Sequence, residues 1–149
     1  MGPADHTKPT MKKPLVGPAA LAQVVSAWNR AGATWDATAL AAVYTDDGLL
    51  FGGRPGHAVG REAIRGYFAS YDGVILSGSM QLSETELRLM GEGSLLAQGM
   101  VHFAFTLAGG EQTRSTMRAT LLLQRGVGGW RILDHHFSTI PLVPPLGKE

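Results

Sequence analysis

One stretch near the end of the chain carries residue types suited to acid–base chemistry. Asp134, His136 and Ser138 occupy every second position there, and Arg118 and Thr120 do so in the preceding alternating stretch. Every second residue of a β-strand lies on one face, so these side chains are expected side by side. A carboxylate beside an imidazole can act as a general acid and base. The alternative is structural, an Arg118–Asp134 ion pair within a subunit interface.

The histidines predict no metal site. His135 and His136 are neighbours on an expected strand and point to opposite faces, so they cannot share one ion. His57 falls in a loop and His102 on a middle strand, and their spacing does not resemble a ligand set. The sequence has no cysteine, which excludes thiolate nucleophiles, disulfides and iron–sulfur clusters. We therefore expect neither a metal nor a cofactor.

Composition excludes several other classes. The 149 residues suit a single domain, and 44% hydrophobic with 17% charged residues allow a real core. A net charge of +1 does not supply the basic field that nucleic acids require. No apolar run reaches the length of a membrane span, and Pro14 and Pro18 interrupt the apolar stretch that a signal peptide needs. We expect a cytoplasmic protein with no nucleic-acid or membrane partner.

Helical spacing dominates the first half of the chain. Apolar residues three and four apart predict helices over 19–31 and from residue 61 to about 71. Asp36 is placed to cap a short helix that includes Tyr44, and the turn-forming residues Thr45–Gly48 would end it. The proline- and lysine-rich residues 1–18 are expected to form a flexible leader.

The second half alternates with a period of two. This pattern predicts strands around Leu87–Leu89, over Val101–Leu107, over Met117–Leu123 and over Trp130–Ser138. Short glycine-containing loops join the last three strands, which suits antiparallel hairpins. Helices followed by an antiparallel meander indicate an α+β fold.

Five segments, in this order, carry a resemblance to a known superfamily: Ala27–Asn29, Ala39–Gly48, Gly60–Ile64, Trp130–Ile132 and His135–Ser138. Over residues 19–140 the chain resembles the nuclear-transport-factor-2-like, cystatin-like cone superfamily. It is most similar to the SnoaL-like and SgcJ/EcaC-type members and to the association domain of calcium/calmodulin-dependent protein kinase II. The resemblance implies a curved antiparallel sheet wrapped around three helices, an internal pocket and dimerisation through the sheet. Residues 141–149 are left as a C-terminal tail.

The resemblance also indicates which strand faces meet the pocket. Aligned with the kinase association domain, Leu121 and Phe137 are pocket-facing, and strand alternation adds Leu133 and His135. The expected pocket lining is Trp28, Tyr44, Leu121, Leu133, His135 and Phe137, with Trp28 and Tyr44 contributed by helices. Such a lining suits a small hydrophobic ligand, although the same residues would also make an ordinary core.

The opposite row of the last two strands is expected to meet a second copy of the chain, because apolar residues there would otherwise face water. This expected dimer face consists of Arg118, Thr120, Trp130, Ile132, His136 and Ser138.

Three functions stay open at this point. The first is an acid–base enzyme of the isomerase, cyclase or dehydratase type on a hydrophobic substrate, with His135 or Asp134 as base and Tyr44 as hydrogen-bond donor. The second is a small-molecule binder without turnover. The third is a non-catalytic homodimeric association module.

Overall fold

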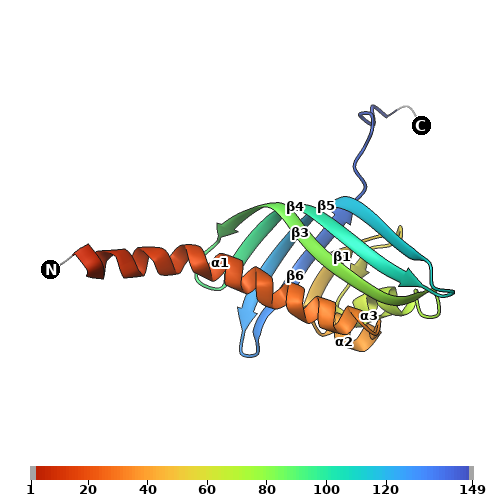
Figure 1. Cartoon of the computed structure of the whole chain (residues 1–149), viewed down its shortest axis with the longest axis horizontal. Coiled ribbons are helices and arrows are strands. Elements are labelled where there is room, and N and C mark those ends of the chain that lie inside the picture. The colour runs from red at the N-terminus through yellow and green to blue at the C-terminus, as the bar shows by residue number, and fades with distance from the viewer. Residues whose placement is uncertain (1–2, 148–149) are drawn as a thin grey trace.

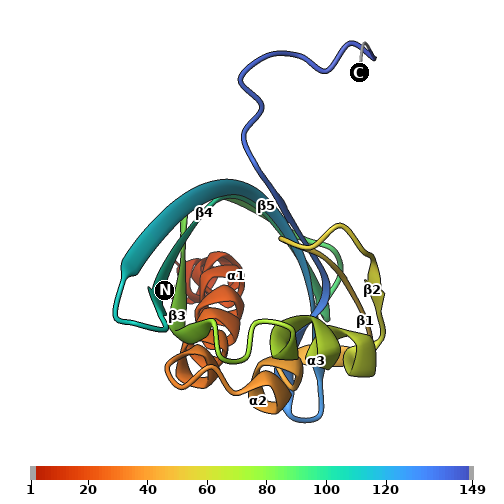
Figure 2. The same cartoon turned by 90° about the vertical axis from the view of Figure 1, so that its right-hand side faces the viewer.

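The structure, a computed structural model, describes residues 3–147 and is an α+β fold. A curved, unclosed sheet arches over three helices, which all lie on its concave side (Figures 1 and 2). The helices are α1 (Pro3–Gly32), α2 (Ala37–Ala41) and α3 (Arg61–Ala69). The strands are β1 (Tyr44–Phe51), β2 (Ala58–Val59), β3 (Ile75–Leu89), β4 (Ser94–Leu107), β5 (Gln112–Gly126) and β6 (Gly129–Ser138).

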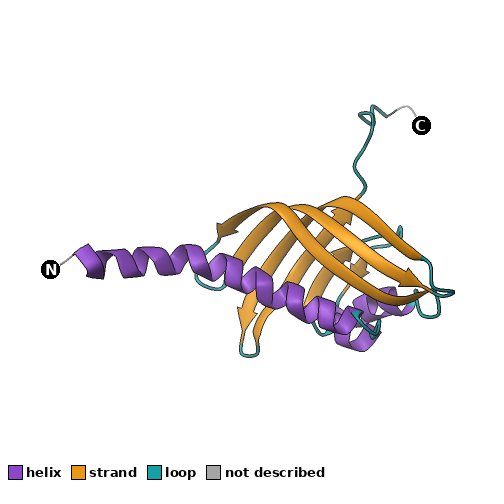
Figure 3. Cartoon of the chain, viewed as in Figure 1, coloured by secondary structure: helices purple, strands orange, loops and turns teal. Residues whose placement is uncertain are grey.

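The six strands form one sheet in the order β2-β1-β6-β5-β4-β3 (Figure 3). Strands β3 to β6 make the predicted antiparallel meander. Strand β1, however, runs parallel to β6, so the sheet is mixed. Alternation in a sequence marks strands but does not show that the first long strand pairs with the last.

Helix α1 begins at Pro3, inside the segment that was expected to be a flexible leader. Its first part projects beyond the sheet (Figure 1), and the proline- and lysine-rich sequence there has no apolar periodicity that would predict a helix. Contact with the sheet begins by Gly17, where an added Cβ would lie 3.3 Å from Leu87 Cδ1. Beyond that point Val24 and Trp28 face the core, as their spacing predicts.

The helix predicted to include Tyr44 is shorter than expected. The Asp36 side chain caps α2 by accepting a hydrogen bond from the Ala39 amide at 3.0 Å, but the helix ends at Ala41. Tyr44 begins β1 instead, and the pairing of β1 with β6 is interrupted by an irregularity between Tyr44 and Leu49. Backbone pairing with β6 has overridden the local helical spacing.

A bulge in β6 reverses the predicted faces of three residues. Leu122 pairs with Asp134 but Leu123 pairs with Ile132, so Leu133 is an extra residue. Because side chains alternate along a strand, one inserted residue reverses the alternation: residues before the bulge face the side opposite to the one that the regular pattern predicts. Ile132 is consequently fully buried in the core. The predictions of Ile132 on the outer dimer face and Leu133 in the inner row are therefore wrong.

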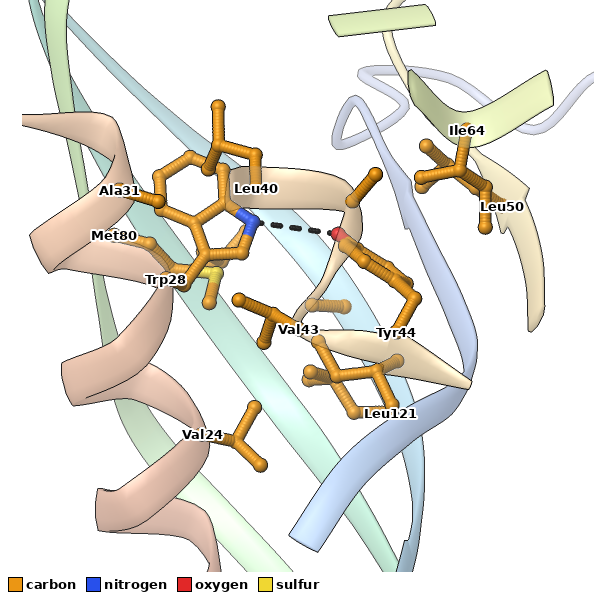
Figure 4. Packing of buried hydrophobic residues seen from close by; sticks show 14 of the residues in the cluster. Val24, Trp28, Ala31, Leu40, Val43, Tyr44, Leu50, Ile64, Met80 and Leu121 are labelled. Atoms are coloured by element: carbon orange, nitrogen blue, oxygen red, sulfur yellow. Dashed lines mark hydrogen bonds between the residues drawn. The ribbon is translucent and has the colours of Figure 1, made fainter. Parts of the chain in front are cut away.

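Trp130 lies on the same side of the bulge as Ile132 and packs against the core, so its place on the predicted dimer face is also wrong. The core itself fills the space between α1 and the sheet (Figure 4). Val24 and Trp28 from α1 meet Leu40 from α2, Tyr44 from β1 and Leu121 from β5 there.

Candidate ligand-binding site

Three buried side chains from α1, β1 and β6 form a hydrogen-bonded chain inside the cone. Tyr44 Oη lies 2.8 Å from His135 Nδ1. Trp28 Nε1 lies 3.3 Å from Tyr44 Oη, the contact drawn as a dashed line in Figure 4. Tyr44 and His135 are 91 residues apart, and the parallel pairing of β1 with β6 brings them together. All three residues are almost completely buried.

The direction of this chain follows from the donors. The Trp28 indole can only donate, so the Tyr44 oxygen accepts from it. Donation of the Tyr44 proton to His135 Nδ1 is the assignment that leaves no hydroxyl proton unpaired, and it places the proton of a neutral imidazole on Nε2. His135 Nε2 is buried and has no hydrogen-bond partner among the described residues. An unpaired buried donor costs about 1–3 kcal/mol.

Burial keeps the hydrogen-bonded side chains of Tyr44 and His135 uncharged at neutral pH. Loss of solvent lowers the pKa of His135 to about 3, and the nearby His136 imidazole adds to the effect. Burial also raises the pKa of Tyr44 far above its ordinary value, against the opposing effect of the Trp28 hydrogen bond. His135 is therefore a weak base and Tyr44 a weak acid. The Tyr44–His135 pair supplies a neutral hydrogen-bonding group.

Asp134 lies on the other side of the sheet from this pair. It is half-buried, and this burial raises its pKa against the opposing influence of His136 and His57. Asp134 therefore cannot act together with His135, its neighbour on the opposite face. The alternative ion pair with Arg118 is not formed in the described part of the chain, because Asp134 pairs with Leu122, four residues along β5.

An aromatic cavity of about 120 Å³ lies between the helices and the sheet. It is lined by Trp28, Trp35, Gly53, Tyr67, Phe68, Tyr71, Ile75, Phe103, Phe105, Ser115, Met117 and Phe137. Of the predicted pocket residues, Trp28 and Phe137 line it. Tyr44, Leu121 and His135 are buried beside it, and Leu133 lies elsewhere.

Most of the aromatic lining was missed by the sequence analysis. Phe103 and Phe105 alternate on β4, and Tyr67 and Tyr71 are four apart at α3, so their spacing alone carried the signal. Trp35 was harder to predict, because it occupies a left-handed backbone conformation (φ 47°) in the turn after α1. That conformation accompanies insertion of the indole into the core, where its Nε1 donates to the Phe68 carbonyl at 3.0 Å.

The loop after β1 closes the cavity on one side. The Gly53 amide donates to Tyr67 Oη at 2.8 Å, and a Cβ on Gly53 would lie only 2.9 Å from Tyr71 Oη, so the loop packs closely on both tyrosine hydroxyl groups. Arg54 lies over the Tyr71 ring at 4.2 Å and donates to Ser70 Oγ at 3.2 Å. The loop is thus fastened to α3 at the edge of the cavity.

A second hollow, of about 490 Å³, lies outside this loop. It shares Gly53, Met117 and Phe137 with the aromatic cavity. The outer hollow therefore borders the aromatic cavity at these three residues.

Within residues 3–147, no three histidine, aspartate or glutamate side chains gather closely enough to hold a metal ion. No helix in this range is both long and apolar enough to cross a membrane.

A curved sheet that encloses helices and an internal cavity defines the class of the fold as cystatin-like, or nuclear-transport-factor-2-like. The chain belongs to the SnoaL-like domain family, which it matches over residues 21–143. A comparison with curated proteins gave no match.

Three solved structures illustrate the likeness. One is a proposed calcium/calmodulin-dependent protein kinase II association domain from Xanthomonas campestris, with 27% identity over 83% of this chain and 87% of that one and a TM-score of 0.73. A cystatin-like protein of the nuclear-transport-factor-2-like group from Novosphingobium aromaticivorans is 14% identical over 90% and 88%, with a TM-score of 0.71. A proposed scytalone dehydratase from the same organism is 14% identical over 93% and 99%, with a TM-score of 0.70. At 14% identity the last two show the fold alone.

Proposed function

We propose that the chain binds a small aromatic molecule in the cavity inside the cone. The observation that carries this proposal is the cavity itself, a space of about 120 Å³ that the chain's own aromatic side chains leave unfilled. An engineered apolar cavity of about 150 Å³ in another protein stays dry and binds benzene. A single aromatic ring with few substituents is therefore the matching ligand size.

The lining suits such a ring chemically. Trp28 and Trp35 meet edge to face with centroids 6.2 Å apart, and Phe103 and Phe105 stack at 5.7 Å. Phe103 packs against Trp28 and Phe105 against Trp35, so the four rings form one continuous aromatic surface. A flat ligand can make the same offset or edge-on contacts with these rings. Ser115 adds one hydroxyl to the lining, so a single polar substituent can be accommodated.

Acid–base turnover is less well supported than binding. A dehydratase or isomerase needs a base with a pKa near the working pH. His135, with its pKa lowered to about 3, does not meet this need, and Asp134 is on the far side of the sheet. We therefore favour binding without turnover and assign the Tyr44–His135 pair a structural part in holding the cavity wall.

Filling the cavity is expected to abolish binding. Ser115→Leu adds an apolar side chain inside the lining, and calorimetric titration with toluene should show affinity at least about tenfold weaker than in the unaltered protein. Arg114→Leu is the matched control, because Arg114 is exposed and adjacent strand residues point to opposite faces. Equal affinity in the unaltered protein and in Ser115→Leu, or no binding near the solubility limit of toluene, would contradict the proposal.

A second candidate function is homodimeric association through the convex face of the sheet. No helix covers this face in the described part of the chain (Figure 2). Leu96 and Leu122 pair there and stay only partly buried. Glu84 and Glu86 line one side of a hollow of about 490 Å³ whose lining also includes Arg118 and His136. A two-fold axis can set opposite charges of this kind against each other in the two copies.

Sedimentation equilibrium at micromolar concentration is expected to give about twice the chain mass of 15.8 kDa. Of the predicted dimer face, Arg118, Thr120, His136 and Ser138 line the hollow on this face. Leu122→Glu should shift the mass toward the monomer, because it buries a charge in the interface. Val127→Glu at the exposed tip of the β5–β6 hairpin is the control and should leave the mass unchanged. A monomeric unaltered protein at this concentration would refute association.

A further inference from the structure

Another hollow, of about 360 Å³, opens between α1, α2 and the beginning of β6. Its lining residues are Gln23, Ala27, Arg30, Ala31, Thr34, Asp36, Ala39, Ala42, Val43, Gly128, Trp130 and Arg131. None of them lines the aromatic cavity, so the two spaces are separate. The volume lies within the range of about 300–1,000 Å³ that small-molecule sites occupy.

The surface of this hollow is mostly apolar. Ala27 and Ala31 from α1 and Ala39 and Ala42 from the α2 region contribute only methyl groups, which leaves room for a ligand. Trp130 adds a flat indole, and Arg125 lies 5.8 Å from the centre of its ring. Methyl groups and an indole together suit a flat hydrocarbon or aromatic group.

Two guanidinium groups add positive charge to the same lining. Arg131 Nε donates to the Ala42 carbonyl at 3.2 Å, which orients the side chain, while Arg30 contacts only Ser26 Oγ, at 3.5 Å. Neither is in an ion pair within residues 3–147. The one carboxylate in the lining, Asp36, has an oxygen engaged as the cap of α2. The net charge of the residues that line the hollow is therefore +1.

We propose that this hollow is a second ligand site, specific for an organic anion that joins a flat aromatic group to a carboxylate. The aromatic group would pack on the alanine methyl groups and Trp130. The carboxylate would accept hydrogen bonds from the guanidinium groups of Arg131 and Arg30, in the geometry that arginine favours for carboxylates. The proposal is independent of the interior cavity, since the two linings share no residue.

The three tryptophans of the chain make the test direct, because each indole N–H gives one signal in a ¹⁵N-resolved NMR spectrum. Trp130 lines this hollow, and Trp28 and Trp35 line the interior cavity. Titration with 2-naphthoate is expected to shift the Trp130 signal with a submillimolar Kd and to leave the other two unchanged. The neutral isostere 2-naphthalenemethanol should bind at least about tenfold more weakly.

Removal of either guanidinium completes the test. Arg30 makes no side-chain hydrogen bond to the backbone of the described residues, so the Arg30→Gln protein should fold normally. Its affinity for 2-naphthoate should be about tenfold weaker. Arg131→Gln should weaken it at least as much, whereas Arg114→Gln, outside the hollow, should not. The proposal is overturned if 2-naphthoate shifts Trp28 and Trp35 instead, if the alcohol binds equally well, or if Arg30→Gln and Arg131→Gln bind like the unaltered protein.

Discussion

Replacing His135 with phenylalanine is expected to flatten the fall in stability between neutral and acidic pH. The unfolded chain takes up a proton at His135 near pH 6.5, whereas the folded chain resists it until about pH 3. Below pH 6.5 the unfolded state therefore binds more protons, and the free energy of unfolding decreases as the pH falls, by about 1.4 kcal/mol per pH unit. This contribution is absent from the His135→Phe variant.

Urea denaturation at pH 7 and pH 4.5 measures the difference. The unaltered protein should lose about 2–3 kcal/mol more than His135→Phe over this interval, whatever the absolute stability of the variant. His136→Phe is the matched control, since it alters the exposed neighbour on the opposite face of β6. It should retain most of the steep pH dependence, because burial is the larger cause of the lowered His135 pKa and the His136 imidazole the smaller one. Parallel pH curves for the unaltered protein and His135→Phe would show that His135 is not a buried neutral imidazole.

A methyl group at Gly32 is expected to destabilise the fold by about 2–3 kcal/mol. Gly32 ends α1 where the helix approaches β3, and an added Cβ would collide with the carbonyl oxygen of Gly78. Backbone atoms cannot rotate away as a side chain can, so α1 would have to shift from the sheet. The shift would also disturb Trp35, because its ring packs directly on the backbone of Gly78. A Cβ built on Gly78 would lie only 2.8 Å from this ring.

Gly66→Ala provides the control for Gly32→Ala. Gly66 lies inside α3, and an added Cβ there would meet nothing within 4 Å. Alanine is the better helix former, so this variant should gain about 0.5–1 kcal/mol. Chemical denaturation of both variants gives the comparison. A Gly32→Ala protein as stable as the unaltered one would mean that α1 and β3 are not in close backbone contact.

The sequence pattern was sufficient to predict that the second helix begins after Asp36, and to predict the third helix and the meander of long strands. It failed where the backbone departs from a regular period. Leu133 is one extra residue in β6, and it moved Ile132 and Trp130 from the predicted outer face to the inner one. An apolar strand with a bulge has the same composition as one without, so the sequence alone could not locate the change of face.

The candidate site was predicted in part for the same reason. Trp28, His135 and Phe137 lie on the inner side, as spacing and the family resemblance indicated. The contact between Tyr44 and His135 depends on the parallel pairing of β1 with β6, which involves segments 91 residues apart. Trp35 reaches the cavity through a left-handed turn that a helical or strand pattern does not reveal.

Intermolecular nuclear Overhauser effects that locate bound toluene test ligand binding inside the cone most directly. Occupancy of the cavity predicts contacts from the toluene protons to the indole rings of Trp28 and Trp35 and to the ring of Phe103, with none to Trp130. Overhauser effects confined to surface residues, or their absence at saturating toluene, would contradict the account that this cone holds a small aromatic ligand.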